Sequence, residues 1–158
     1  MSAPYIGALA NREFVKMNGL GNEIVIVDLR RAPKPIEPAA ARAATHASAD
    51  EISEMEEILD RQQEKLSKGD SAIPEDSEFH YSIALASGNS VVLKVLDTLM
   101  DLLRDTRERS LQVDGRPPKS LAGHRRILSA IKKHDAVAAE AAMRRHIEDV
   151  EEMVLEKL

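Results

Sequence analysis

The sequence predicts an all-α protein: an antiparallel bundle of six to seven helices over residues 36–158, preceded by a short N-terminal segment that is β-hairpin-like or disordered. Apolar residues recur at intervals of three and four from residue 37 onward, which is the period of an amphipathic helix. The breaks between these stretches are short and several carry glycine, proline or asparagine, so consecutive helices are expected to run antiparallel. With two tyrosines and two phenylalanines, the chain has too few aromatic residues for a typical β-sandwich core.

The composition narrows the possible functions. The chain has 158 residues, of which 43% are hydrophobic and 31% charged, a balance that fits one globular domain. It contains no cysteine, which excludes disulfide scaffolds, thiolate metal sites and cysteine nucleophiles. Its 22 basic and 27 acidic residues give a net charge of -5, which disfavours direct binding to nucleic acid. Since no apolar run reaches bilayer length and the start resembles no secretory signal, we expect no membrane partner and a cytoplasmic location.

Residues 1–35 differ in pattern from the rest of the chain. Two β-rich runs, 13–17 and 23–27, are separated by an Asn-Gly-Leu-Gly-Asn loop whose residues tolerate positive φ. X-Pro steps around residue 35 disfavour helix and mark a junction. We therefore expect an N-terminal segment over 1–35 that contains a possible hairpin, and a helical domain over 36–158.

Start and stop signals place six helices in this second part. Ser48 and Glu51 form a capping-box pattern at the start of the second helix, and Gly69 supplies its end. Asn89 can cap a long fourth helix, and the Gly and Pro residues of 113–118 predict a loop after it. The expected helices are 37–47, 48 to about 67, 74–88, 89 to about 111, one through 121–131, and one from 135 to the C-terminus.

Three of the five histidines lie on or beside apolar helix faces. His80, His124 and His146 come from three different expected helices, and Asp76 precedes His80 by one helical turn. Each histidine taken singly also fits a half-buried side chain bonded to a backbone carbonyl. As a group facing one core, these four side chains need polar partners, because each unsatisfied buried polar group costs on the order of 1–3 kcal/mol. One divalent cation would satisfy all four, so the sequence predicts a metal site made of Asp76, His80, His124 and His146.

Imidazole nitrogens and a carboxylate oxygen suit zinc first, with nickel, manganese or iron as alternatives. A metal that accepts five or six ligands would keep positions open for water or a ligand oxygen, as a sensing or catalytic site requires. His46 and His134 fall near the ends of helices, where an imidazole favours the helix dipole, and we expect them outside the site.

Several motifs of the helical part form a distinctive pattern: IEPAAARAA (36–44), DSEFHYSIALASGN (76–89), GHRRILSAIKKHD (123–135) and AAEAAMRRHIEDV (138–150). Through them, residues from about 36 to 158 resemble the FCD domain, the all-helical effector-binding and dimerisation domain of GntR-type transcriptional regulators of the FadR subfamily. In metal-binding members of that family an Asp and three His hold the cation. The resemblance places these ligands at Asp76, His80, His124 and His146.

The resemblance also implies a function. It implies that an organic acid or similar small carboxylate effector binds beside the metal and that the domain forms a homodimer. DNA would be bound only through a winged helix-turn-helix, which residues 1–35 cannot form. An arginine that often precedes the first helix in this family is replaced by Pro33, so the effector-binding candidates are Arg30, Arg31 and Asn89.

The N-terminal segment resembles a different protein. FVKMNGLGNEIVIVDLR (14–30) is similar to the opening strand, loop and strand of diaminopimelate epimerase. That enzyme needs two cysteine thiols and two α/β lobes, and a chain of 158 residues without cysteine supplies neither. Epimerase activity is therefore excluded, and a fused gene start, a truncated regulator or an artificial join could each explain the segment.

The sequence thus favours a metal-dependent sensing and dimerisation domain with no catalytic residues. A small metal-dependent hydrolase and a purely structural helical interaction module are the alternatives. Val91, Leu93 and Leu102 lie off the main apolar stripe of the fourth helix, which fits either a dimer interface or a helix buried within its own bundle.

Overall fold

The computed structural model describes residues 14–19, 22–27, 36–102 and 115–155. The contacts divide the chain into two compact units, Met1–Pro35 and Ile36–Leu158, and each unit is described by itself.

The first unit contains a two-stranded antiparallel ribbon. Strand β1 spans Phe14–Gly19 and strand β2 spans Asn22–Val27. Phe14 pairs with Val27 at the open end and Gly19 pairs with Asn22 at the turn. The β-branched residues of β2 fit this extended pairing.

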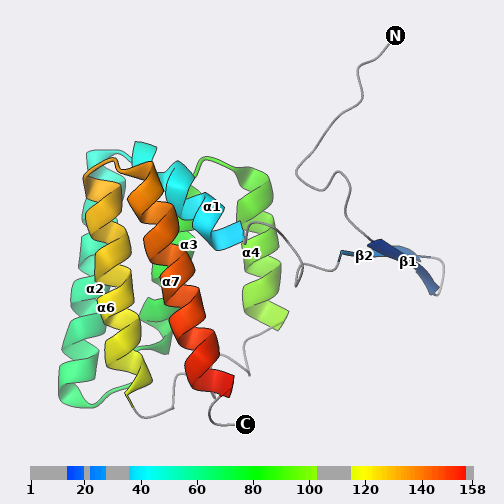
Figure 1. Cartoon of the computed structure of the whole chain (residues 1–158). Helices are drawn as coiled ribbons and strands as arrows, with labels where there is room; N and C mark the ends of the chain where they lie inside the picture. The colour runs from blue at the N-terminus through cyan, green and yellow to red at the C-terminus, as the bar shows by residue number, and fades with distance from the viewer. Residues whose placement is uncertain (1–13, 20–21, 28–35, 103–114, 156–158) are drawn as a thin grey trace. The chain divides into compact units, whose positions relative to one another are not determined.

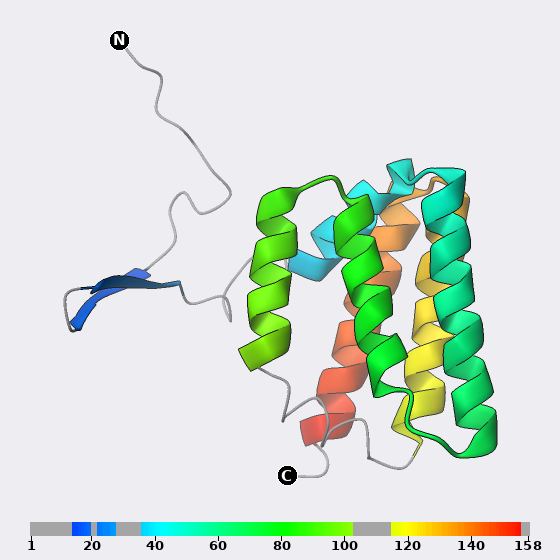
Figure 2. The same cartoon turned by 180° about the vertical axis from the view of Figure 1, so that it is seen from behind.

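The second unit is an antiparallel bundle of helices, which confirms the all-α prediction (Figure 1, Figure 2). The connections 69–72, 87–89 and 133–135 are short, so the helices that they join run in opposite directions. None of the described helices is both long and apolar enough to span a bilayer. The helices are α1 (Ile36–Ala43), the 3-10 turn η1 (Ala44–His46), α2 (Ala49–Lys68), α3 (Ile73–Ala86), α4 (Ser90–Leu102), α6 (Arg116–Lys132) and α7 (Ala136–Leu155).

The predicted signals at the ends of α2 are present. Ser48 accepts a hydrogen bond from the backbone N–H of Glu51, and the Glu51 carboxylate accepts one from the backbone N–H of Ser48. These hydrogen bonds lower the pKa of the Glu51 carboxyl. At the other end, Gly69 adopts a left-handed conformation with φ 76°, which a residue with a Cβ would adopt only under strain.

Two predicted boundaries are wrong. The first helix is α-helical only as far as Ala43, after which the backbone tightens into η1. The proline pair 117–118, expected in a loop, lies in the first turn of α6 instead. Proline fits there because the first turn of a helix has no intrahelical use for its N–H groups. The expected extension of the fourth helix to residue 111 lies outside the described residues.

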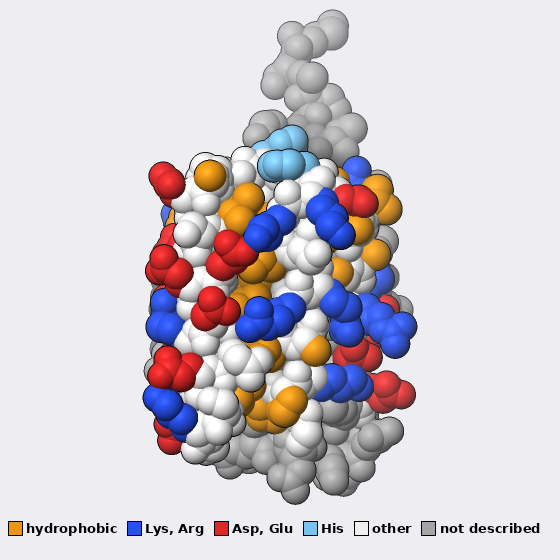
Figure 3. Space-filling view, turned by 90° about the vertical axis from the view of Figure 1, so that its left-hand side faces the viewer, with side chains coloured by type: hydrophobic (Ala, Val, Ile, Leu, Met, Phe, Trp, Pro, Cys, Tyr) orange, Lys and Arg blue, Asp and Glu red, His pale blue; other side chains and the backbone are white. Residues whose placement is uncertain are grey.

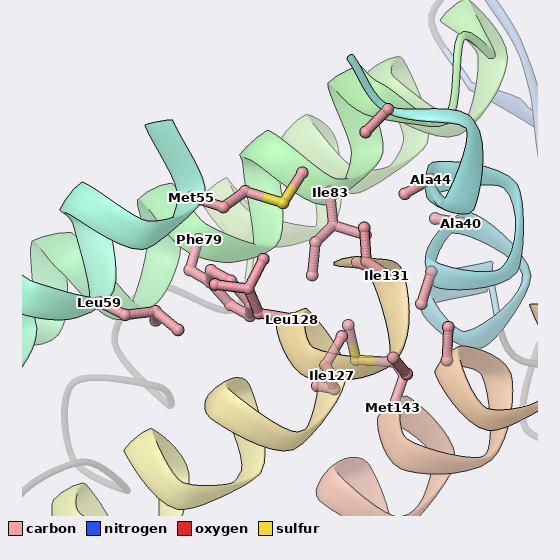
Figure 4. Close-up of a cluster of buried hydrophobic side chains, with 14 of the residues drawn as sticks. Ala40, Ala44, Met55, Leu59, Phe79, Ile83, Ile127, Leu128, Ile131 and Met143 are labelled. Carbon is pink, nitrogen blue, oxygen red and sulfur yellow. The ribbon is translucent and has the colours of Figure 1, made fainter. Parts of the chain in front are cut away.

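The apolar core joins helices α2, α3, α6 and α7 (Figure 4). Met55 and Leu59 come from α2, Phe79 and Ile83 from α3, and the C-terminal helices add the residues that close the core. The further large apolar side chains that are buried in it are Ile58, Leu121, Ile127, Leu128, Ile131 and Met143. Interdigitation of these side chains fixes how α3, α6 and α7 are placed relative to one another.

Candidate metal centre

The structure brings three of the sequence-predicted ligands together. His80 on α3, His124 on α6 and His146 on α7 are all buried. Each offers a ring nitrogen, and these nitrogens lie within 4.8 Å of one another. The Nε2 atoms of His80 and His124 are 3.2 Å apart. The three imidazoles therefore converge on one point of the described bundle, although they are separated by up to 66 positions in the chain.

Asp76 joins this group from the turn of α3 that precedes His80. Its side chain is buried, and its Oδ1 lies 3.7 Å from Nε2 of His124. The same Oδ1 accepts a hydrogen bond of 2.6 Å from the hydroxyl of Ser120 on α6. The carboxylate is thus held at the edge of the histidine group and oriented by a neighbouring helix.

The spacing of the His80, His124 and Asp76 atoms is close to what one divalent cation requires. Nitrogen and oxygen ligands that each lie about 2.0–2.2 Å from one zinc ion are separated from one another by roughly 3.0–3.5 Å. The 3.2 Å between the two imidazole nitrogens falls in that range, and the 3.7 Å to Asp76 is slightly longer. Nitrogen donors with one carboxylate oxygen are also a donor set that suits zinc and its neighbours in the first transition row.

The electrostatics of His146 favour the form that a cation needs. Burial lowers the pKa of His146 from 6.5 to about 4, because the charged imidazolium would lose its hydration. Asp76 and Asp149 act in the opposite direction, while the guanidinium groups of Arg116 and Arg126 lower the pKa further. At neutral pH this imidazole therefore carries no proton that a metal ion would have to displace.

Two polar residues beside the ligands were not predicted from the sequence. Ser120 precedes His124 by one turn of α6, a spacing that could have identified it. Gln62 on α2 is fully buried, and its Oε1 lies 3.0 Å from Nδ1 of His124. A signal for Gln62 exists as well, because it continues the apolar stripe of Ile58 and Leu59 with a polar side chain.

Gly123 provides the space in which His146 lies. It is buried on α6 next to His124, and a Cβ built at this position would lie 2.6 Å from Nδ1 of His146. That distance is shorter than two non-bonded atoms tolerate, so a side chain here would displace the imidazole. Glycine therefore permits the close approach of α6 and α7 at the cluster.

A narrow pocket adjoins the histidines on the side of α1. It is lined mainly by apolar side chains and is too narrow to hold a water molecule in this structure. One wall is His80, whose Nδ1 lies 3.7 Å from the carboxylate of Glu37. The remaining lining residues are Ala40, Ile83, Val92, Leu96 and Met143.

The other residues considered from the sequence lie elsewhere. Asn89 accepts hydrogen bonds from the backbone N–H groups of Val91 and Val92, so its amide caps α4. Arg30 and Arg31 lie outside the described residues. His46 and His134 are both exposed. His134 follows the end of α6 with φ 54°, and its Nδ1 donates to the Thr45 carbonyl at 2.7 Å.

A larger hollow on the surface does not involve the cluster. It runs between α2 and α6 with a volume of about 670 Å³, and its apolar floor includes Leu59 and Leu128 (Figure 3). Its rims carry charges that pair across the groove: Lys132 with Glu56, and Arg125 with Asp60 at 3.4 Å. The remaining lining residues are Ser129 and Lys133. Since the polar groups of the cluster converge elsewhere, this groove is not the predicted site.

Known proteins resemble the helical unit over most of its length. The FCD domain family matches residues 27–149. The Uxu operon regulator of Haemophilus influenzae is 29% identical over 136 residues, which cover 82% of this chain and 51% of the regulator. The solved structure of Streptococcus agalactiae GntR has a TM-score of 0.59 at 28% identity, over 72% of this chain and 52% of that one. E. coli McbR/YncC shares the fold, with a TM-score of 0.68 at 16% identity over 77% of this chain and 60% of that one.

Diaminopimelate epimerase gives a shorter match. The enzyme of Rhodopseudomonas palustris is 58% identical over 48 residues, which cover 30% of this chain but 16% of the enzyme. The chain thus spans about half the length of the curated regulator that it matches, and a small fraction of the epimerase.

Proposed function

The chain belongs to the FCD domain family, and we propose that it is a metal-dependent sensing and dimerisation domain that responds to a small organic acid. Domains of this family are the ligand-sensing parts of GntR-type transcriptional regulators and are not enzymes. The observation that carries the metal-dependent part is the convergence of three buried imidazoles beside a buried carboxylate.

Zinc is the proposed cation, with nickel, manganese and iron as the alternatives to be compared. Asp76, His80, His124 and His146 would hold it, since their donor atoms have suitable chemistry and spacing. When bound, the cation supplies a positive centre at which a carboxylate oxygen of the effector can bind. Burial keeps His146 neutral and Ser120 orients Asp76, so the chain presents these two ligands ready for binding.

The effector is proposed to bind beside the cation, next to the narrow pocket at His80. This pocket has no room for a water molecule in the present packing, so its apolar walls would have to move apart to take the carbon skeleton of an organic acid whose carboxylate is at the cation. The ligands belong to α3, α6 and α7, so binding would favour one packing of these helices over another. The effector can shift that equilibrium only by the difference in its affinity for the two packings.

Exposed apolar side chains support the proposed homodimer. Val91 on α4 is 68% exposed, and Leu85 and Tyr81 on the neighbouring α3 are also exposed. Leu93 is partly buried. A second copy of the domain would cover such a surface. DNA binding would depend on a winged helix-turn-helix, which none of the described residues forms. We propose that the regulator acts in the cytoplasm.

The proposal is tested by metal binding. Metal-free protein is titrated with zinc, nickel, manganese and ferrous iron by calorimetry, and we expect one cation per chain and a higher melting temperature. Because His124 supplies a central ligand, His124→Ala is expected to weaken binding by more than about 100-fold. The matched control is His134→Ala, which removes an exposed imidazole and is expected to leave the affinity within about twofold.

A second titration tests the effector. A panel of small mono- and dicarboxylates is added to protein with and without the cation, and we expect binding that is much tighter when the cation is present. The proposed function fails if the wild-type protein neither binds nor is stabilised by any of these cations.

A further inference from the structure

We propose that Gln62 is a positioning residue of the metal centre, which holds His124 in the tautomer and ring orientation that present Nε2 to the cation. This proposal rests on the proposed metal binding and adds a residue that lies outside the predicted ligand set. Gln62 belongs to α2, the one helix of the four around the site that contributes no ligand.

The contact that carries the proposal is the hydrogen bond between these two side chains. Nδ1 of His124 donates to Oε1 of Gln62 at 3.0 Å. His124 is completely buried, and Gln62 is 1% exposed. Both partners are therefore shielded from bulk water, which makes the hydrogen bond between them costly to lose.

The direction of this hydrogen bond determines which nitrogen can bind a cation. An amide oxygen is an acceptor only, so Nδ1 of His124 must carry the proton. In a neutral imidazole the other nitrogen, Nε2, is then left with its lone pair. That atom faces Nε2 of His80 at 3.2 Å and the carboxylate of Asp76 at 3.7 Å.

The other side of the ring is restrained by packing. The ring of Phe79 lies 4.6 Å from that of His124 between centroids, and the His146 ring lies at 4.7 Å. These contacts fix the plane of the imidazole but do not distinguish its two nitrogens. Gln62 supplies that distinction, because its amide oxygen lies within hydrogen-bond distance of Nδ1.

Such an outer hydrogen bond affects metal affinity directly. A histidine that donates its remote N–H to a fixed acceptor is a better ligand, since the lone pair is oriented in advance and is more basic. Removal of an acceptor of this kind typically weakens metal binding by about 10–100-fold. A glutamine with a merely structural role would change stability and leave the tautomer of His124 unaltered.

The experiment compares variants at two adjacent glutamines. Gln62→Met removes the acceptor while it keeps an unbranched side chain of similar size, and Gln62→Glu keeps an oxygen at the same place. Gln63→Met is the matched control, because Gln63 follows on the same helix and is exposed. Two quantities are measured: the ring-nitrogen NMR signals of His124 in metal-free protein, and the zinc dissociation constant.

We expect the wild-type protein to show a protonated Nδ1 and an unprotonated Nε2 at His124. Gln62→Met should give a mixture of tautomers and a dissociation constant raised about 10–100-fold, and Gln62→Glu should restore both properties. Gln63→Met should match the wild type. Melting temperatures identify any variant that fails to fold, and in that case the wild-type tautomer still decides the matter.

The role of Gln62 and the proposed metal binding are overturned by different results. A wild-type protein with its proton on Nε2 of His124 overturns the role of Gln62 whatever the metal affinity. Zinc binding and tautomer that are both unchanged in Gln62→Met overturn it as well, while the proposed function stands. A wild-type protein with the expected tautomer but no affinity for any cation overturns the proposed function, and with it the purpose assigned to Gln62.

Discussion

The apolar core and the polar cluster are built by the same helices but obey different physical rules. Phe79 and His80 are consecutive on α3, and both are buried. Phe79 stabilises the fold by removing apolar surface from water, which requires only good packing. His80 and its polar neighbours lose their hydrogen bonds to water on burial. Specific protein or metal partners must replace those bonds. We therefore expect the apolar core to provide most of the free energy of unfolding. We expect the polar cluster to lower that free energy, because its residues are arranged for binding and not for packing.

The largest expected effect is on the core side of this comparison. Phe79→Ala should lower the free energy of unfolding by about 3–5 kcal/mol, because it leaves a cavity among α2, α3 and α6. Urea denaturation measures this change. Glu78→Ala, at an exposed position of the same helix, removes only a surface ion pair with Arg61 and should stay within about 1 kcal/mol. Equal effects of the two changes would contradict the assignment of Phe79 to the core.

On the cluster side, acid should destabilise the metal-free protein. The pKa of His146 is about 4 in the folded protein and 6.5 as its ordinary value, so the unfolded chain binds more protons between these pH values. The contribution of the neutral His146 to the free energy of unfolding is fully present above pH 6.5. It falls by up to roughly 3 kcal/mol as the pH drops from 6.5 through 4. Denaturation curves at a series of pH values measure this slope.

The control for this prediction is His146→Leu, which removes the titrating group and keeps an apolar side chain at the position. Its stability should depend less on pH within the same window. If the slope is the same in both proteins, other groups cause the acid sensitivity and His146 is not protonated in the way described.

Gly123→Ala tests whether the cluster limits the packing of the bundle. In an ordinary helix interior this change stabilises by about 1 kcal/mol. Here the new Cβ would lie 2.6 Å from the His146 ring, so we expect a loss of about 1–3 kcal/mol and weaker zinc binding. Thermal unfolding and calorimetry measure the two effects. Ala122→Ser, at an exposed neighbour, should change neither, and a stabilised Gly123→Ala protein would contradict the close approach.

The smallest expected effect concerns a residue that belongs to neither region. Ser48→Ala removes the hydroxyl that caps α2, and the expected loss of stability is about 1 kcal/mol. Zinc affinity should be unchanged, because the cap lies on the exposed surface and contacts no ligand. A change in affinity as large as that of a cluster variant would show that stability and binding cannot be separated in this protein.

Part of the site follows from the sequence and part does not. The apolar stripes place His80, His124 and His146 on inward faces, and the one-turn spacing connects Asp76 to His80. Ser120 likewise precedes His124 by one turn. That spacing alone does not distinguish it from a helical serine that has no part in a site. Gln62 is 62 positions away from His124, and only the packing of α2 against α6 brings the two together.

The sequence by itself determined the helical class, most helix ends and the faces that are buried, because these depend on local hydrogen bonding and on the period of apolar residues. Tertiary structure alone decided which nitrogen of His124 faces the cluster, and that Gly123 must lack a side chain. Both depend on the distance between neighbouring helices, which is set by the interlocking of side chains from all of them and not by any one segment.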